Sequence, residues 1–145
     1  MAKKDKTLPA KAVESPERGK VTRIRDHQST NGYPSWRFST VDRTGPFAWP
    51  IGQEIEVKIL AKLHQFDSMK WPTIEGDDHH FIETKRLSKE AQDRLADLKQ
   101  DDVDGVFSFH FSGKRRIIGI RSGDIVKLLW WDPEHKVCVS HKKHT

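Results

Sequence analysis

The stretch VFSFHFSGKRRIIGIRSGDIVKLLWWDPEHKV, residues 106–137, decides the fold because it holds three extended runs joined by two tight turns. In the first run, phenylalanine alternates with serine and histidine, which is the period-two pattern of a strand with one buried face. Ser112-Gly113-Lys114 and Ser122-Gly123-Asp124 can each reverse the chain. The third run, IVKLLWWD, is almost continuously apolar, which is typical of a central strand covered on both faces. The stretch therefore predicts an antiparallel meander.

The residues before this meander predict one further strand and two helices. PSWRFSTVD, residues 34–42, alternates apolar and polar side chains, as a strand does. Helical spacing of apolar residues predicts a helix over 53–69, which Pro72 would end. A second helix is predicted over 89–99, with Ser88 as its N-cap. The polar segment between these helices, residues 73–86, is expected to be a loop.

This order of elements, β-α-α-β-β-β, predicts an α+β fold of two layers. Two helices would pack on one face of an antiparallel sheet of about four strands, and the other face would stay open. Residues 34–139 would form this single domain. Residues 1–33 hold few large apolar side chains, so they are expected to be a disordered basic tail, and residues 140–145 a second basic tail.

Composition and charge narrow the class of partner and the compartment. The chain of 145 residues has a formal net charge of +5 and a pI of about 9.4, which favours an anionic partner. A single cysteine, Cys138, excludes a framework of intramolecular disulfides. No stretch has the character of a signal peptide or a transmembrane helix. The sequence therefore predicts a cytoplasmic protein with no membrane partner.

The meander carries a family resemblance. Its stretch FSFHFSGKRRIIGIRSGDIVKLLWW, with a basic residue at the head of the middle strand, resembles the RelE/ParE toxin superfamily, and the likeness covers residues 35–138. The resemblance implies a RelE-like toxin of a toxin-antitoxin system, which cleaves mRNA on the ribosome and is blocked by a cognate antitoxin. No cofactor is expected. The closing WWDPEHKVCVSHKKHT is also similar to the ends of uncharacterised bacterial proteins, and that similarity implies little about activity.

Two other functions stay open at this point. One is a non-catalytic nucleic-acid-binding or regulatory protein that keeps the same fold. The other is a protein-interaction module whose partner is acidic, such as an antitoxin or gyrase.

Cleavage of RNA by its own 2′-hydroxyl needs a proton acceptor, a group that stabilises charge on the phosphate, and a proton donor. Arginine suits the phosphate and histidine suits the proton transfers. Strand alternation predicts that Arg115 and Arg121 share one face with Gly119 between them, where a ligand backbone could come close. His110 is expected on the same open face and His135 near it. The candidate catalytic residues are therefore Arg121, Arg115, His110 and His135.

Other residues are candidates for contact with nucleic acid. Trp130 and Trp131 are adjacent, so on a strand they point to opposite faces and one could stack on a base. The full set of contact candidates is Arg116, Lys114, Lys136 and Trp131.

Two polar clusters remain. Cys138 stands where members of the superfamily often carry a tyrosine, and with His141 and His144 it makes only a weak zinc pattern, so no metal is expected. Asp77, Asp78, His79 and His80 form a charged cluster that could act as acid or base if its loop folds over the sheet.

Overall fold

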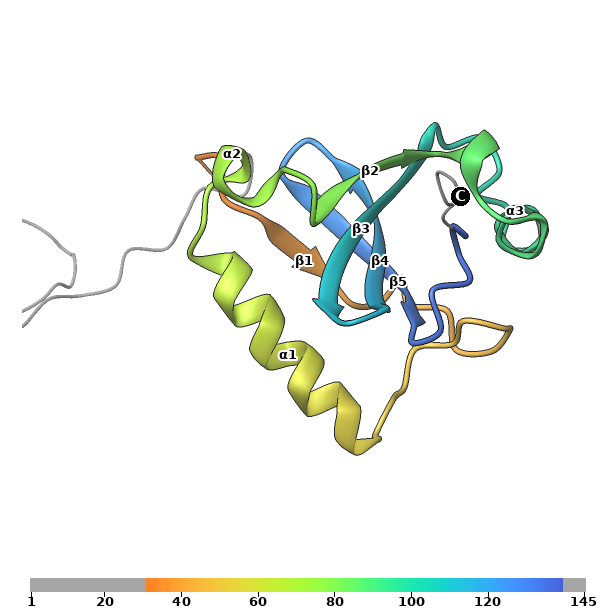
Figure 1. Cartoon of the computed structure of the whole chain (residues 1–145), viewed down its shortest axis with the longest axis horizontal. Coiled ribbons are helices and arrows are strands. Elements are labelled where there is room, and N and C mark those ends of the chain that lie inside the picture. Colours follow the sequence, from red (N-terminus) through yellow and green to blue (C-terminus); the bar gives the residue numbers. More distant parts are fainter. Residues whose placement is uncertain (1–30, 140–145) are drawn as a thin grey trace, which may run out of the picture.

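The computed structural model of the protein describes residues 31–139, so most of the expected N-terminal tail and all of the expected C-terminal tail lie outside the described residues. Figure 1 shows the arrangement of the elements. In chain order they are β1 (Ser35–Arg37), α1 (Glu54–Asp67), α2 (Trp71–Ile74), β2 (His79–Glu83), η2 (Thr84–Arg86), α3 (Lys89–Asp97), β3 (Gly105–Ser112), β4 (Arg115–Ser122) and β5 (Ile125–Asp132).

The α+β class is confirmed, but the sheet differs from the expected four antiparallel strands. It has five strands in the order β1-β5-β4-β3-β2. The meander β3-β4-β5 is antiparallel as predicted, whereas β1 runs parallel to β5, which makes the sheet mixed. The additional strand is β2, which lies inside residues 73–86, the segment expected to be a loop.

The composition of β5 correctly indicated a strand covered on both faces. β5 lies between β1 and β4. Leu128 and Trp131 belong to one buried cluster, and Leu129 and Trp130 belong to the other. Both tryptophans are therefore core residues, and Trp131 is only 7% exposed.

The two-layer prediction placed both helices on one face of the sheet, but α1 and α3 pack on different faces. Ile59, Leu63 and Phe66 of α1 pack with Phe107 and Phe109 of β3 in the first cluster, on what we call the α1 face. Figure 1 shows α1 in yellow and α3 in green on different sides of the strands.

On the other side of the sheet, which we call the α3 face, Ala91 and Leu95 of α3 pack with Ile118 and Trp130. Consecutive strand residues point to opposite faces, which explains this division except at the register shift in β5, where the adjacent Leu129 and Trp130 lie in the same cluster. The expected open face is therefore partly covered.

Local capping explains where the helices begin. Ser88 is the predicted N-cap of α3, and its hydroxyl accepts a hydrogen bond from Ala91 N at 3.1 Å. Glu56 in the first turn of α1 reaches back to accept from Gly52 N at 2.8 Å and from Trp49 Nε1 at 3.0 Å. Pro72 lies in the first turn of α2, where proline is tolerated, so it begins a short helix after α1 has already ended.

Gly119 serves the packing of the sheet and not a ligand. A Cβ added at Gly119 would lie 2.6 Å from Val126 Cγ1 and 3.0 Å from the carbonyl oxygen of Lys127. The space that we expected to admit a ligand backbone is therefore filled by β5. The register of β4 and β5 also shifts between Ile118 and Gly119, which is the mark of a β-bulge.

Within residues 31–139, no helix is both long and apolar enough to span a membrane.

Candidate functional site

The predicted catalytic residues are divided between the two faces of the sheet. His110 pairs with Arg116 across β3 and β4, and Arg116 pairs with Asp132 across β4 and β5. Directly opposed residues share a face, so these three lie in one row on the α3 face. The expectation that His110 shares a face with Arg115 and Arg121 is therefore wrong, because those arginines point to the α1 face.

Arg121 and Arg115 are occupied by contacts on the α1 face. The Arg121 guanidinium lies 3.7 Å from the ring centroid of Trp71, and its Nη1 lies 2.9 Å from Glu75 Oε2. The Arg115 guanidinium lies 4.8 Å from the ring centroid of Phe111 and donates to the Ser112 hydroxyl. Cation–π and ion-pair contacts of this kind stabilise the fold. The catalytic role of these two arginines stays a prediction.

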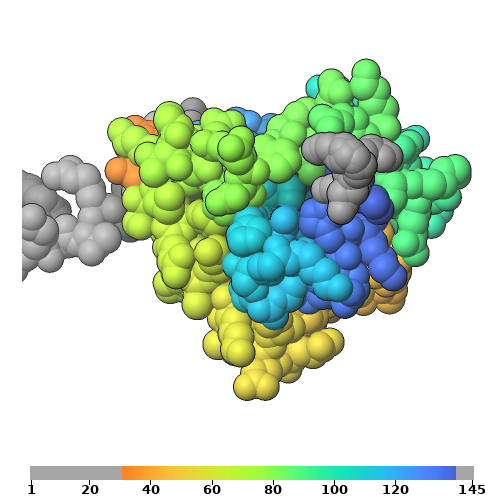
Figure 2. Space-filling model, viewed as in Figure 1, coloured from red at the N-terminus to blue at the C-terminus, as the bar shows by residue number. Residues whose placement is uncertain are grey.

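The α3 face carries a polar pocket of about 640 Å³ where several segments of the chain meet. Figure 2 shows the turn between β3 and β4 in cyan and the segment after β5 in blue lying side by side, next to the green residues that include β2 and η2. A volume of this size lies within the usual range for small-ligand sites. The polar residues that line it are Asp77, Asp78, His80, Lys85, Arg86, Ser108, Arg116, Asp132, His135 and Cys138.

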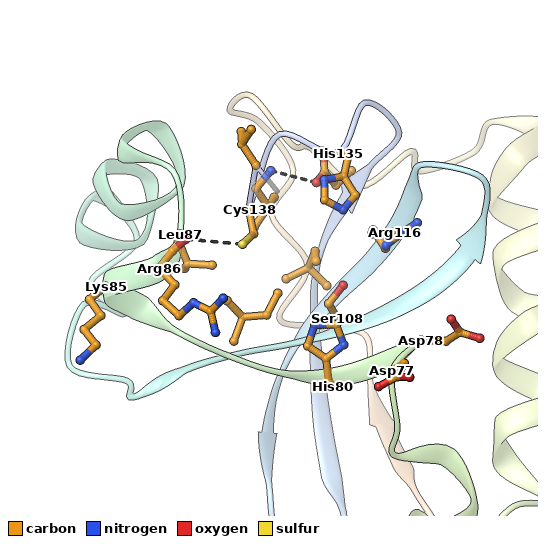
Figure 3. A pocket seen from close by; sticks show the side chains of 15 residues that line it. Asp77, Asp78, His80, Lys85, Arg86, Leu87, Ser108, Arg116, His135 and Cys138 are labelled. Carbon is orange, nitrogen blue, oxygen red and sulfur yellow. Dashed lines mark hydrogen bonds between the residues drawn. The ribbon is translucent and has the colours of Figure 1, made fainter. Parts of the chain in front are cut away.

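The floor of the pocket is formed where β2, β3 and β4 lie side by side. Ser108 of β3 pairs with His80 of β2 on one side and with Ile118 of β4 on the other. Figure 3 shows Ser108 and His80 in the middle of the pocket. Lys85 and Arg86 form its cationic end, and Asp77 and Asp78 form its acidic end. The chain turns into η2 directly after β2, and this turn positions the two cations.

The guanidinium of Arg116 lines the pocket, and only some of its N–H donors are used in hydrogen bonds to the described residues. Its Nη1 donates to the carbonyl oxygens of Gly113 at 2.7 Å and Arg115 at 3.0 Å. Its Nε and Nη2 make no hydrogen bond within residues 31–139. Burial lowers the pKa of Arg116, while Asp132 and Asp78 act to raise it. The side chain stays charged at neutral pH, because arginine ordinarily titrates above about 12.

Asp132 organises the turn that carries His135. Asp132 is 2% exposed, and its two carboxylate oxygens accept hydrogen bonds from the backbone N–H groups of Lys136 and Val137, both at 2.9 Å. His135 lies inside this turn with a left-handed φ of 58°, a conformation that histidine adopts more readily than most residues. The turn brings His135 to the wall of the pocket, where Figure 3 shows its imidazole.

The imidazoles near the pocket differ in how they are held. Neither the His80 nor the His135 ring makes a hydrogen bond within the described residues. His79 points to the α1 face, where its ring packs on Phe66 and its Nδ1 accepts from His110 N at 3.0 Å. Burial lowers the pKa of His79, in agreement with its role as a neutral acceptor. His110 Nε2 lies 3.1 Å from the Gly113 carbonyl oxygen, outside the pocket lining.

The remaining nucleic-acid contact candidates are dispersed. Lys114 Nζ lies 2.7 Å from Glu134 Oε1 in an exposed ion pair, and Lys136 is exposed beyond the pocket. Trp131 is buried against Phe111 and presents no face on which a base could stack.

The weak zinc pattern gains no support from the described residues. The Cys138 thiol donates to the carbonyl oxygen of Arg86 at 3.4 Å, and burial raises its pKa, so the thiol stays protonated at neutral pH. His141 and His144 lie outside the described residues. In the range 31–139, no group of three or more His, Cys, Asp or Glu side chains could hold a metal ion.

Sequence reasoning did not identify Ser108, Lys85 or Arg86, and it named His80 only as part of a loop cluster. The missing observation was β2, because pairing of β2 with β3 places His80 beside Ser108. A small polar residue among the apolar residues of β3 was the one available signal for Ser108.

Comparison with known proteins gives no match: no family model, no curated protein and no solved structure matches the chain.

Proposed function

We propose that this protein binds RNA in the pocket on the α3 face and cleaves it at the phosphate beside a 2′-hydroxyl. One observation carries the proposal: Arg116, His80 and His135 line one pocket although they come from β4, β2 and the turn after β5. One arginine and two histidines are the groups that this reaction needs. The reaction is the one implied by the RelE/ParE resemblance, but the proposed site lies across the sheet from Arg121.

The chemistry assigns a separate task to each side chain. One neutral imidazole of the His80 and His135 pair takes the proton of the 2′-hydroxyl, whose oxygen then forms a bond to phosphorus. The bond from phosphorus to the 5′ oxygen breaks, and the other imidazole, in its protonated form, gives its proton to that oxygen. The free Nε and Nη2 donors of Arg116 stabilise the charge on the non-bridging oxygens. The products are a 2′,3′-cyclic phosphate and a 5′-hydroxyl.

The cationic end of the pocket supports binding of a polyanion. Lys85 and Arg86 are exposed and lie at one end of the pocket, where they can contact phosphates of neighbouring nucleotides. Their contribution would weaken as salt increases, because binding to phosphates releases counterions. Action on ribosome-bound mRNA and inhibition by an antitoxin protein are part of the proposal, as the resemblance implies.

The test compares adjacent arginines that point to opposite faces. Cleavage of an end-labelled RNA, with and without ribosomes, is measured for the full chain and for Arg116→Ala and Arg115→Ala. We expect Arg116→Ala to lower the cleavage rate by about 10²–10³-fold, the effect of removing one charge-stabilising donor. Arg115→Ala should cleave within a few-fold of the parent protein.

Two results would overturn the proposed activity or its location. Full activity of Arg116→Ala together with loss in Arg115→Ala would move the site to the α1 face. Salt-dependent RNA binding without any cleavage would show that the protein is a nucleic-acid-binding module and not an enzyme.

A further inference from the structure

The Ser108 hydroxyl is a buried polar group without a hydrogen-bond partner among residues 31–139. Ser108 is 4% exposed, yet its hydroxyl takes part in no hydrogen bond within residues 31–139. Two polar side-chain atoms of the described residues are completely enclosed and unpartnered, Trp36 Nε1 and Trp71 Nε1, and Ser108 Oγ is not one of them. The hydroxyl therefore reaches the surface of the pocket, which Ser108 lines.

Because the Ser108 hydroxyl has no hydrogen-bond partner within residues 31–139, whatever occupies the pocket must supply one. Alanine would fill the same place on β3 between His80 and Ile118 and leave no polar group there. The position of the hydroxyl is explained if a ligand atom completes its hydrogen bonding. That ligand atom must lie at the floor of the pocket.

The neighbours of Ser108 define the chemistry of the ligand. His80 is its directly opposed partner on β2, and Arg116 lies on the same face of β4, two residues from Ile118. The imidazole and the free guanidinium N–H groups can donate to the same ligand as the hydroxyl. Asp132 also lines the pocket, and its charge acts on Arg116, but each of its oxygens accepts a backbone N–H group of the turn after β5.

We infer that Ser108, His80 and Arg116 form a phosphate-binding subsite at the floor of the pocket. A tetrahedral phosphate offers several acceptor oxygens and a negative charge, which suit three donors that come from three adjacent strands. This inference rests on the proposed function, because it assigns the position of the phosphate within the same pocket. It also makes a claim about binding that does not depend on cleavage.

The experiment measures binding of inorganic phosphate and of uridine 3′-monophosphate to the full chain by calorimetry, with uridine as the comparison. The parent protein should bind both phosphates and bind uridine at least tenfold more weakly. Ser108→Ala should weaken phosphate binding by about tenfold, the loss expected for one hydrogen bond to a charged group. Its thermal unfolding midpoint without ligand should be unchanged or higher, because the hydroxyl makes no hydrogen bond within the described part of the chain.

Ser112→Ala is the matched control, since Ser112 lies on the same strand and its hydroxyl accepts from Arg115 on the other face. This variant should bind phosphate like the parent protein. Equal phosphate affinity in Ser108→Ala and the parent, or no phosphate binding by the parent, would overturn the inference.

The outcomes separate the inference from the proposed function. Phosphate binding that needs Ser108, in a protein that cleaves no RNA, would keep the subsite and remove the catalytic proposal. RNA cleavage that is unaffected by Ser108→Ala would keep the activity and remove the subsite.

Discussion

Asp42 lies at the centre of a buried network of hydrogen bonds that includes an ion pair with Arg94. Asp42 is 4% exposed, and its carboxylate accepts from Arg94 Nε and Nη2, both at 2.8 Å, and from Trp130 Nε1 at 2.9 Å. Burial alone would raise the pKa of Asp42, but the hydrogen bonds from Arg94 and Trp130 outweigh it and lower the pKa. This network ties the loop after β1 to α3 and to β5.

We predict that Asp42→Asn lowers the free energy of unfolding by about 2–3 kcal/mol at neutral pH, because hydrogen bonds to a charged group are lost. Urea unfolding measures the change. Asp93→Asn is the control. Asp93 also accepts from a cation, Lys89 Nζ at 2.7 Å, but this pair is exposed and should contribute less than about 1 kcal/mol. Equal losses in both variants would contradict the account.

The difference in unfolding free energy between the parent protein and Asp42→Asn should also depend on pH, with a defined sign. The folded pKa of Asp42 lies below its ordinary value of 3.8, so its stabilisation is fully present above that value. The stabilisation is lost as the pH falls through the folded pKa. The difference in unfolding free energy between the parent and Asp42→Asn should therefore shrink from pH 5 towards pH 2. A difference that stays constant over this range would contradict the assignment.

The role of a residue could be predicted from the sequence where its partners are close along the chain, and not where they are distant. Ser88 was identified as a cap because its hydroxyl needs only Ala91 N, three residues away. Arg121 was selected as catalytic, yet its contacts are with Trp71 and Glu75, which are far from it in the sequence. No local pattern reveals such partners.

At the scale of elements, the packing of β4 against β5 depends on Gly119. We predict that Gly119→Ala lowers the free energy of unfolding by about 1–3 kcal/mol, because the new methyl group overlaps Val126 and the Lys127 backbone. Gly76→Ala is the matched control, since a Cβ there meets nothing within 4 Å. Chemical unfolding of both variants measures the difference, and equal stability of the two would contradict the packing described for this bulge.

A helix or strand could be predicted from the sequence where the spacing of its apolar residues is regular. The meander and both long helices follow from alternation and helical spacing, and the structure has them at the expected positions. β2 was missed because HHFIE is short and polar, and it becomes a strand through pairing with β3. The parallel pairing of β1 with β5 was missed for a similar reason, because it joins segments about 90 residues apart.

At the scale of the whole molecule, the helices that pack on the two faces of the sheet determine where a binding site can form. The helices α1 and α2 close the α1 face over Phe107 and Phe109, and α3 covers only part of the α3 face. The polar pocket occupies the part of the α3 face beside η2 and the turn after β5. The sequence indicated the residue types of the site, whereas the division of Arg116 and Arg121 between faces required the observed packing.

The most direct test of the central claim is an NMR titration of the full chain with a short single-stranded RNA at low salt, followed through side-chain signals. If RNA binds in the pocket on the α3 face, the imidazole signals of His80 and His135 should shift. The indole N–H signals of Trp71 and Trp36, on the α1 face, should stay in place. Shifts of the Trp71 indole and the Arg121 guanidinium with unchanged His80 and His135 signals would contradict the central claim.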